Sequence, residues 1–335
     1  MTIDQPVSSP AARPLLVTHG GKFHCDEVFA YAVLRLALDL HEPGRDHTLL
    51  RTRKPEPIAD ADIVWDVGTV FDAAAKRFDH HQRGAPMRPD GTPFSSAGLI
   101  WQVYGERAVA RLLPTGAEQH AAAIAAEIEE SMVRRIDEID NGVSATGPIT
   151  RDTLGLATLI GDLNPTWDDD ASNGASAGDA AFLEAASLAG SVLRRRVDIL
   201  RARLAAEAIV LAAYRRAEDP RILVLDRGMP WKNAVFTHDL PVLFSVSPAS
   251  NGNWMVDTMP PEPGSFAQRL PLPEAWAGLQ AADLARESGV PDAVFVHLRR
   301  FVGAAGSREG AIAMAQKAVA QKAVAQTAAA ASDQV

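Results

Sequence analysis

The sequence contains a single cysteine among its 335 residues, so no disulfide can form within one chain. Because disulfides are rare in reducing compartments, we expect a cytoplasmic protein. The chain also lacks any run of about 18 apolar residues, which argues against a membrane span. Residues 1–13 lack the basic start and the apolar centre of a signal peptide, and we expect them to form a disordered tail.

Basic residues are outnumbered, with 33 Lys and Arg against 42 Asp and Glu, and the net charge is -9. This charge disfavours broad electrostatic capture of duplex nucleic acid, although a short or single-stranded substrate in a locally basic cleft stays open. No G-x-x-x-x-G-K-[ST] run occurs, which excludes a P-loop enzyme. Cys25 lies among carboxylates that raise the pKa of a thiol, which disfavours a cysteine nucleophile.

Short apolar runs alternate with helix-like segments in the first half of the chain. Val28, Ala32, Leu36 and Leu40 form one helical stripe within 26–40. The predicted strands are 13–19, 47–53, 61–68 and 76–82. This alternation predicts an α/β fold whose mostly parallel sheet is flanked by helices on both faces.

The length predicts two domains rather than one. The polar, Gly/Ser-rich stretch from Asp168 to Asp179 predicts a surface loop or hinge, followed by a long helix from about Ala180 to Arg216. The predicted segments are the tail 1–13, a first domain 14–167, a hinge loop and connecting helix 168–216, a smaller second α/β domain 217–316, and a low-complexity helical tail 317–335.

Acidic and histidine side chains occur where the predicted strands and helices begin or end. They are His19, His24, Asp26, Asp66, Asp79, His80, His81 and Asp140. Ligands collect outside the carboxyl ends of the strands in an open parallel sheet, so we expect these side chains to converge. Imidazoles and carboxylates without thiolates suit Mn²⁺, Mg²⁺, Fe²⁺ or Zn²⁺ and argue against a structural zinc site. A carboxylate with ligands on both sides is typical of a two-metal site.

Each of these residues also has a simple structural interpretation. Asp26 could cap a helix, and Asp140 could serve a turn before Asn141 and Gly142. Independent structural needs seldom place acids and histidines at four successive element ends, so we prefer the metal site.

Seven motifs carry a resemblance to a known family. In order they are "THGGKFHCDE", "DVG", "RFDHHQ", "SSAGLIW", "IDNG", "RLPLPEAWAGL" and "REGAIAMA". With them the chain resembles the melanocyte-proliferating-gene-one family, also called the metal-dependent protein hydrolase family, within the DHH phosphoesterase superfamily. The resemblance covers about residues 15–316. It implies a DHH domain at 14–167, a substrate-binding domain at 217–316, an active-site cleft between them, and the 3′-to-5′ RNA exonuclease activity of eukaryotic members.

The resemblance also implies roles for individual residues. The implied metal ligands are His19, His24, Asp26, Asp66, His80 and Asp140. Among these, Asp66 would bridge two cations. His81 would face the bound phosphate as a catalytic residue, and Asp79 would orient an imidazole.

Substrate binding is assigned to the second domain. The candidates are Arg269, His297, Arg299, Gly303 and Ser307, with "FVGAAGS" as a backbone anion nest. A solvated strand end is the equal alternative for Arg299. The chain has His19-Gly20-Gly21 where the family reads His-Asn-Gly, and it lacks the family's Gly-Gly-Asn-Lys near Gly303. The second departure removes a polar and a basic side chain from a substrate loop, so substrate choice stays open.

We expect a phosphodiester hydrolase in which two divalent cations, Mn²⁺ first and Mg²⁺ second, activate a water. The expected reaction is 3′-5′ exonuclease cleavage of short or single-stranded RNA. Three alternatives stay open: a small-molecule phosphatase or pyrophosphatase with the same metal site, a non-catalytic metal-binding regulatory module, and a hydrolase of a non-phosphate bond. Whether two chains form a homodimer is also open.

Overall fold

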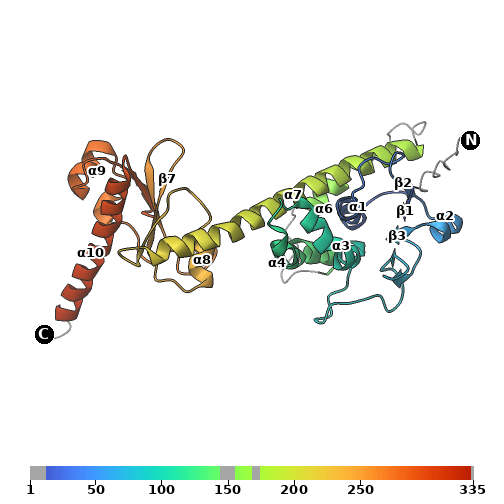
Figure 1. Ribbon diagram of the computed structural model, residues 1–335, viewed down its shortest axis with the longest axis horizontal. Coiled ribbons are helices and arrows are strands. Elements are labelled where there is room, and N and C mark those ends of the chain that lie inside the picture. Colours follow the sequence, from blue (N-terminus) through green and yellow to red (C-terminus); the bar gives the residue numbers. More distant parts are fainter. Residues whose placement is uncertain (1–12, 144–154, 168–173, 333–335) are drawn as a thin grey trace, which may run out of the picture. The chain divides into compact units, whose positions relative to one another are not determined.

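The computed structural model describes residues 13–143, 155–167 and 174–332. The chain forms two compact units, Met1–Arg201 and Ala202–Val335, and the boundary falls within helix α7 (Gly174–Arg215). Each unit contains a five-stranded mixed sheet flanked by helices, so the fold is α/β as the sequence predicts (Figure 1). Among the described residues, none of the helices combines the length and the apolar character needed to cross a membrane.

The first sheet is mostly parallel. Its strands are β1 (Leu15–Thr18), β2 (Thr48–Arg51), β3 (Ile63–Trp65), β4 (Phe71–Asp72) and β5 (Arg77–Phe78), in the order β2-β1-β3-β5-β4. Strand β1 pairs in parallel with β2 and β3, and β3 pairs in parallel with β5. Only β4 is antiparallel to its neighbour. The carboxyl ends of the four parallel strands therefore share one edge.

Helices cover both faces of this sheet. Figure 1 shows α1 (Cys25–Leu38) and α3 (Ser96–Leu112) on one side, and α2 (Pro55–Asp60) on the other. Leu16 and Val17, adjacent in β1, are both fully buried, as expected for a strand covered on both faces. The remaining helices of the unit are η1 (Glu118–His120), α4 (Ala121–Ile128), the π-helical turn η2 (Glu129–Val133), α5 (Arg134–Asp140) and α6 (Leu156–Gly161).

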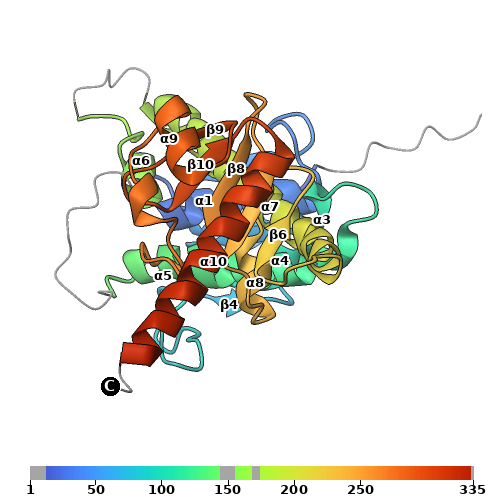
Figure 2. The same ribbon diagram turned by 90° about the vertical axis from the view of Figure 1, so that its left-hand side faces the viewer.

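The second unit has one parallel and three antiparallel strand pairs. Its strands are β6 (Ile222–Val224), β7 (Phe244–Pro248), β8 (Trp254–Thr258), β9 (Ala293–Val296) and β10 (Val302–Ala305), in the order β6-β7-β8-β10-β9. Its helices are α8 (Lys232–Thr237), η3 (Glu274–Trp276), α9 (Ala281–Ser288) and α10 (Arg308–Ser332). Figure 2 shows α10 lying across the sheet, where Met314 packs with Phe244 and Val256. A second cluster joins Val235 of α8 to Val210 of α7.

The predicted loop at 168–179 differs from the structure. Residues 168–173 lie outside the described part of the chain, but α7 already begins at Gly174, six residues before the predicted helix start. Alanines at 175, 177, 180 and 181 have high helix propensity, which the Gly and Ser residues beside them obscured. The helix α10 extends to Ser332, across the low-complexity repeat.

Candidate metal centre

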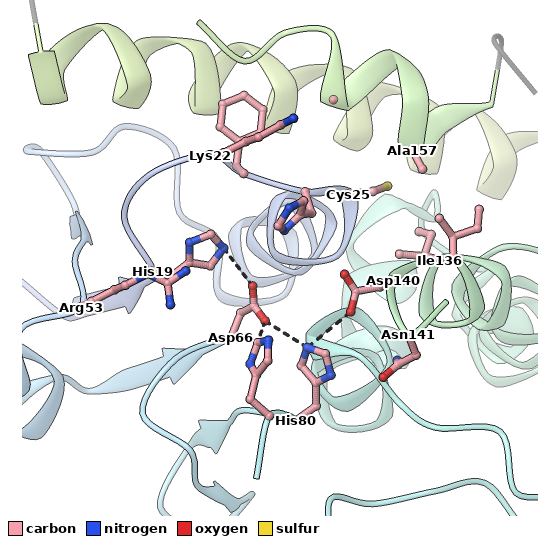
Figure 3. Close-up of a pocket in the computed structure, with 15 residues that line it drawn as sticks. His19, Lys22, Cys25, Arg53, Asp66, His80, Ile136, Asp140, Asn141 and Ala157 are labelled. Carbon is pink, nitrogen blue, oxygen red and sulfur yellow. Dashed lines mark hydrogen bonds and ion pairs between the residues drawn. The ribbon is translucent and has the colours of Figure 1, made fainter. Parts of the chain in front are cut away.

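Five of the six predicted ligands line one pocket of the first unit, called here the metal pocket (Figure 3), whereas Asp26 is not among its lining residues. The pocket has a volume of about 650 Å³ and is lined by His19, His24, Asp66, His80, His81 and Asp140 among others. Three of the contributing segments directly follow β1, β3 and β5, at the shared carboxyl edge of the parallel strands. The strand-end rule therefore brings together side chains that lie far apart in the sequence.

Asp66 occupies the middle of the cluster. Its Oδ2 lies 3.1 Å from Nε2 of His19, while its Oδ1 lies 3.1 Å from Nε2 of His80. Figure 3 shows the carboxylate between these two imidazoles. The two oxygens of one carboxylate thus face different histidines, which is the arrangement required of a bridging ligand.

Asp26 and Asp140 lie on the His80 side of the cluster. Nε2 of His80 is 3.5 Å from Oδ2 of Asp140 and 3.9 Å from Oδ2 of Asp26. His24, Asp26 and Asp140 each offer a ligand atom within 4.8 Å of the others. The buried Oδ1 of Asp26 has no hydrogen-bond partner among the described residues. A buried carboxylate oxygen of this kind fits a cation ligand, since an unpaired one is costly.

Glu27 belongs to the same cluster although sequence reasoning gave it no role. Its Oε1 lies 2.8 Å from Nε2 of His19, and its carboxylate accepts the backbone N–H of His24. Its position next to Asp26, in the first turn of α1, is the sequence feature that could have indicated it as a site residue. Glu27, His19 and His24 also place ligand atoms within 4.8 Å of one another.

The electrostatics of the cluster reflect crowded, buried carboxylates. Burial and the neighbouring acidic charges raise the pKa of Asp26, and they raise the pKa of Glu27 and of Asp140 to about 8. Burial of several carboxylates close together thus disfavours their charged forms, and positive charge placed among them would favour ionisation. A divalent cation bound by imidazole and carboxylate ligands fits this chemistry.

The contacts between Asp66 and its two histidines favour the charged form of each partner, whereas burial disfavours it. Burial opposes the charged form of Asp66, but hydrogen bonds to His19 and His80 outweigh it and hold the pKa of Asp66 at about 2. Burial likewise lowers the pKa of the two histidines, but Asp66 and the other carboxylates raise the pKa of His19 to about 10 and that of His80 to about 9. Asp66 therefore stays ionised.

His81 projects from the cluster toward solvent. Its Nδ1 lies 2.7 Å from Oδ1 of Asp79, and its side chain is 55% exposed. The same Asp79 oxygen accepts the backbone N–H of His80 at 2.8 Å. Asp79 thus orients the imidazole of His81 through its Nδ1.

A buried network fixes the helices that carry the ligands. Oγ of Ser96, at the start of α3, donates to Oδ2 of Asp26 at 2.7 Å. Asp137, one turn before Asp140, accepts from Ser95 at 2.5 Å and from an Arg88 guanidinium nitrogen at 2.7 Å. A Cβ on Gly98 would lie 2.1 Å from Asp137, so only glycine allows this approach. The network ties α5 to the helix start that holds Asp26.

The predicted substrate residues lie in the second unit. Arg269 donates to the backbone carbonyl of Leu240 at 2.7 Å, whereas His297 and Arg299 are exposed. Ser307 accepts the backbone N–H of Gly310 at the start of α10.

The predicted anion nest includes Gly303. This residue is buried in β10, where its backbone pairs with Val296. An extended strand directs successive backbone N–H groups to opposite sides, whereas an anion nest needs them on the same side. Arg53 and Lys22, which sequence reasoning missed, line the metal pocket instead. Arg53 lies just beyond β2, so the strand-end rule would have indicated it.

Comparison with known proteins gives a consistent result. The family model MYG1_exonuc, described as "Uncharacterised protein family (UPF0160)", matches residues 15–319. The MYG1 exonuclease of Homo sapiens is 37% identical over 332 residues, covering 91% of this chain and 85% of the human protein. A MYG1 protein of Caenorhabditis elegans is 36% identical over 334 residues, covering 91% and 95%. One from Schizosaccharomyces pombe is 32% identical over 323 residues, covering 91% and 97%.

Proposed function

This chain belongs to the MYG1 exonuclease family, and from that premise we propose that it is a divalent-metal-dependent hydrolase of phosphodiester bonds. The preferred reaction is trimming of short or single-stranded RNA from its 3′ end. In this proposal residues 14–167 form a DHH-type catalytic domain. The names of the human and bovine relatives, both MYG1 exonuclease, support a nucleic-acid substrate.

The observation that carries the proposal is the position of Asp66 between His19 and His80, 3.1 Å from each. His19, His24 and Glu27 would hold one ion with Asp66, and Asp26, His80 and Asp140 would hold a second. The Oδ1 of Asp26, which has no hydrogen-bond partner in the part of the chain that the structure describes, supports this ligand set. Mixed imidazole and carboxylate ligands favour Mn²⁺, with Mg²⁺ as the alternative.

Two divalent ions, when bound, supply the Lewis acidity that lowers the pKa of a water and neutralises a phosphate. The chain's own residues position the substrate. His81, oriented by Asp79, donates from Nε2 to a phosphate oxygen or protonates the leaving oxygen. Arg53 and Lys22 add positive charge at the pocket wall, where they attract the phosphate.

The proposal predicts Mn²⁺-dependent shortening of a 5′-labelled RNA, one nucleotide at a time, and no shortening with EDTA. Loss of a general acid slows a reaction by about 100-fold or more, so His81→Ala should lower kcat to that extent. His41→Ala is the matched control, because its side chain is 75% exposed and lies outside the metal pocket. Product ladders on a gel, with kcat from initial rates, measure both effects.

Other outcomes would favour the alternatives. Pyrophosphate or mononucleotide hydrolysis without RNA cleavage would indicate a small-molecule phosphatase. Tight Mn²⁺ binding without turnover of any phosphoester would indicate a regulatory module. Peptide cleavage without phosphoester cleavage would indicate a hydrolase of a non-phosphate bond.

A further inference from the structure

A second cavity adjoins the metal pocket and is called here the apolar hollow. Its volume is about 610 Å³, and three residues line both cavities: Arg53, Asp66 and His81. The remaining wall is mainly aliphatic and includes Ile58, Val64, Val67 and Val70. An apolar cavity therefore opens beside the carboxylates that would hold the ions.

The apolar hollow is built by the same turn that positions Asp66. Asp66, Gly68 and Thr69 all have positive φ, at 56°, 98° and 55°. Helix α2 forms the opposite wall, where Ile58 approaches Gly68 so closely that an added Cβ would lie 3.2 Å from it. Asp79 accepts the backbone N–H of Thr69 and closes the turn. The wall of the hollow is thus fixed relative to the metal ligands.

Arg53 supplies positive charge where the two cavities meet. Its side chain is exposed and forms no ion pair with any described residue. In contrast, Arg77, which also lines the hollow, donates to the backbone carbonyl of Ala61. An arginine that forms no ion pair within the described part of the chain, beside a candidate metal centre, suits a phosphate group.

We propose that the apolar hollow binds the base of the nucleotide whose phosphate lies at the metal centre. This inference rests on the proposed function and adds a subsite to it. A nucleotide carries an anionic phosphate and a planar apolar face, which match Arg53 and the aliphatic wall. The cavity size is within the range of small-molecule sites. Because the wall is mainly aliphatic, although Thr69, Arg77 and Asp79 also line it, the subsite should discriminate little between bases.

The test compares the affinities of adenosine 5′-monophosphate and ribose 5-phosphate for the Mn²⁺-supplemented protein by calorimetry. Burial of the apolar face of one base against aliphatic side chains should strengthen binding about tenfold. Val70→Trp fills the hollow and should abolish this preference. Val103→Trp on α3 should keep it, because Val103 is 46% exposed, like Val70 at 48%, but lies outside both cavities.

Equal affinities of the wild-type protein for the two ligands would overturn the subsite, and this comparison needs no variant. A preference that persists in Val70→Trp, with unchanged thermal stability, would also overturn it. RNA shortening assayed on the same preparations separates the two claims. Shortening with no base preference leaves the proposed function standing, whereas the absence of Mn²⁺-dependent phosphodiester cleavage removes both.

Discussion

The Asp26 carboxylate depends on one neighbouring hydroxyl for its orientation. Ser96 donates to Oδ2 at 2.7 Å, while Oδ1 has no partner among the described residues. Asp26 is almost fully buried, so its direction is set by this hydrogen bond and by packing. Groups that orient a metal ligand in this way affect metal affinity without touching the ion.

Ser96→Ala should therefore weaken Mn²⁺ binding by about 10- to 100-fold. Ser131→Ala is the control, because its hydroxyl donates to the Glu127 carbonyl of the preceding helix α4, at 2.7 Å, and does not contact Asp26. Calorimetric titration measures both. Unchanged affinity in Ser96→Ala would mean that packing alone orients Asp26.

The sequence predicts individual site residues only where a local rule applies. His19, Asp66 and His80 follow strands, and the strand-end rule brings them together. Ser96 lies 70 residues from Asp26, and no local pattern indicates their contact. In the sequence, Glu27 could equally be an acidic residue that stabilises a helix start. Only its distance of 2.8 Å from His19 places it in the cluster.

At the scale of elements, the loop between β1 and α1 is held by a distant segment. The side chain of Asn164 accepts the backbone N–H of Phe23 and donates to its carbonyl, both at 2.8 Å. The two residues are 141 positions apart. The Arg51 guanidinium also donates to the carbonyl of Gly21. These contacts fix the loop that carries His19 and His24.

Asn164→Ala should leave both backbone groups of buried Phe23 without partners and lower the free energy of unfolding by about 1–3 kcal/mol. It should also weaken Mn²⁺ binding, since His24 follows Phe23 directly. Thermal unfolding and Mn²⁺ titration measure the two effects. Asn233→Ala, on the exposed surface of α8, should change neither. A destabilised Asn164→Ala variant with unchanged Mn²⁺ affinity would show that Asn164 stabilises the loop without affecting the metal site.

In the whole molecule, the proposed metal ligands all lie in the first unit and the predicted substrate residues in the second. The sequence predicts the α/β class and the strands at 13–19, 47–53, 61–68 and 76–82, because hydrophobic runs and the turn residues between them are local features. It does not predict the order of the strands within the sheet. It misplaced the start of α7, since an Ala- and Gly-containing stretch suits a helix or a loop and tertiary context decides. The role of the second unit stays a prediction.

Two arginines of the second unit should have different effects when replaced by alanine: one on substrate binding, the other on stability. Arg299→Ala should raise KM for RNA several-fold without affecting unfolding, because its side chain is exposed. Arg269→Ala should lower the free energy of unfolding by about 1–3 kcal/mol, because its guanidinium binds the Leu240 and Val242 carbonyls. Steady-state kinetics and denaturant unfolding measure these effects. A KM unchanged in Arg299→Ala would assign that residue to a solvated strand end.

The central claim is that one carboxylate joins two metal positions. Mn²⁺ titration with electron paramagnetic resonance tests it most directly on the wild-type chain and on Asp66→Asn. Asparagine tolerates the left-handed backbone found at Asp66, φ 56°, so the turn should survive the substitution. We expect two ions per wild-type chain with a spin-coupled signal, and loss of the coupling in Asp66→Asn. A single ion in the wild-type chain, or coupling that persists in Asp66→Asn, would contradict it.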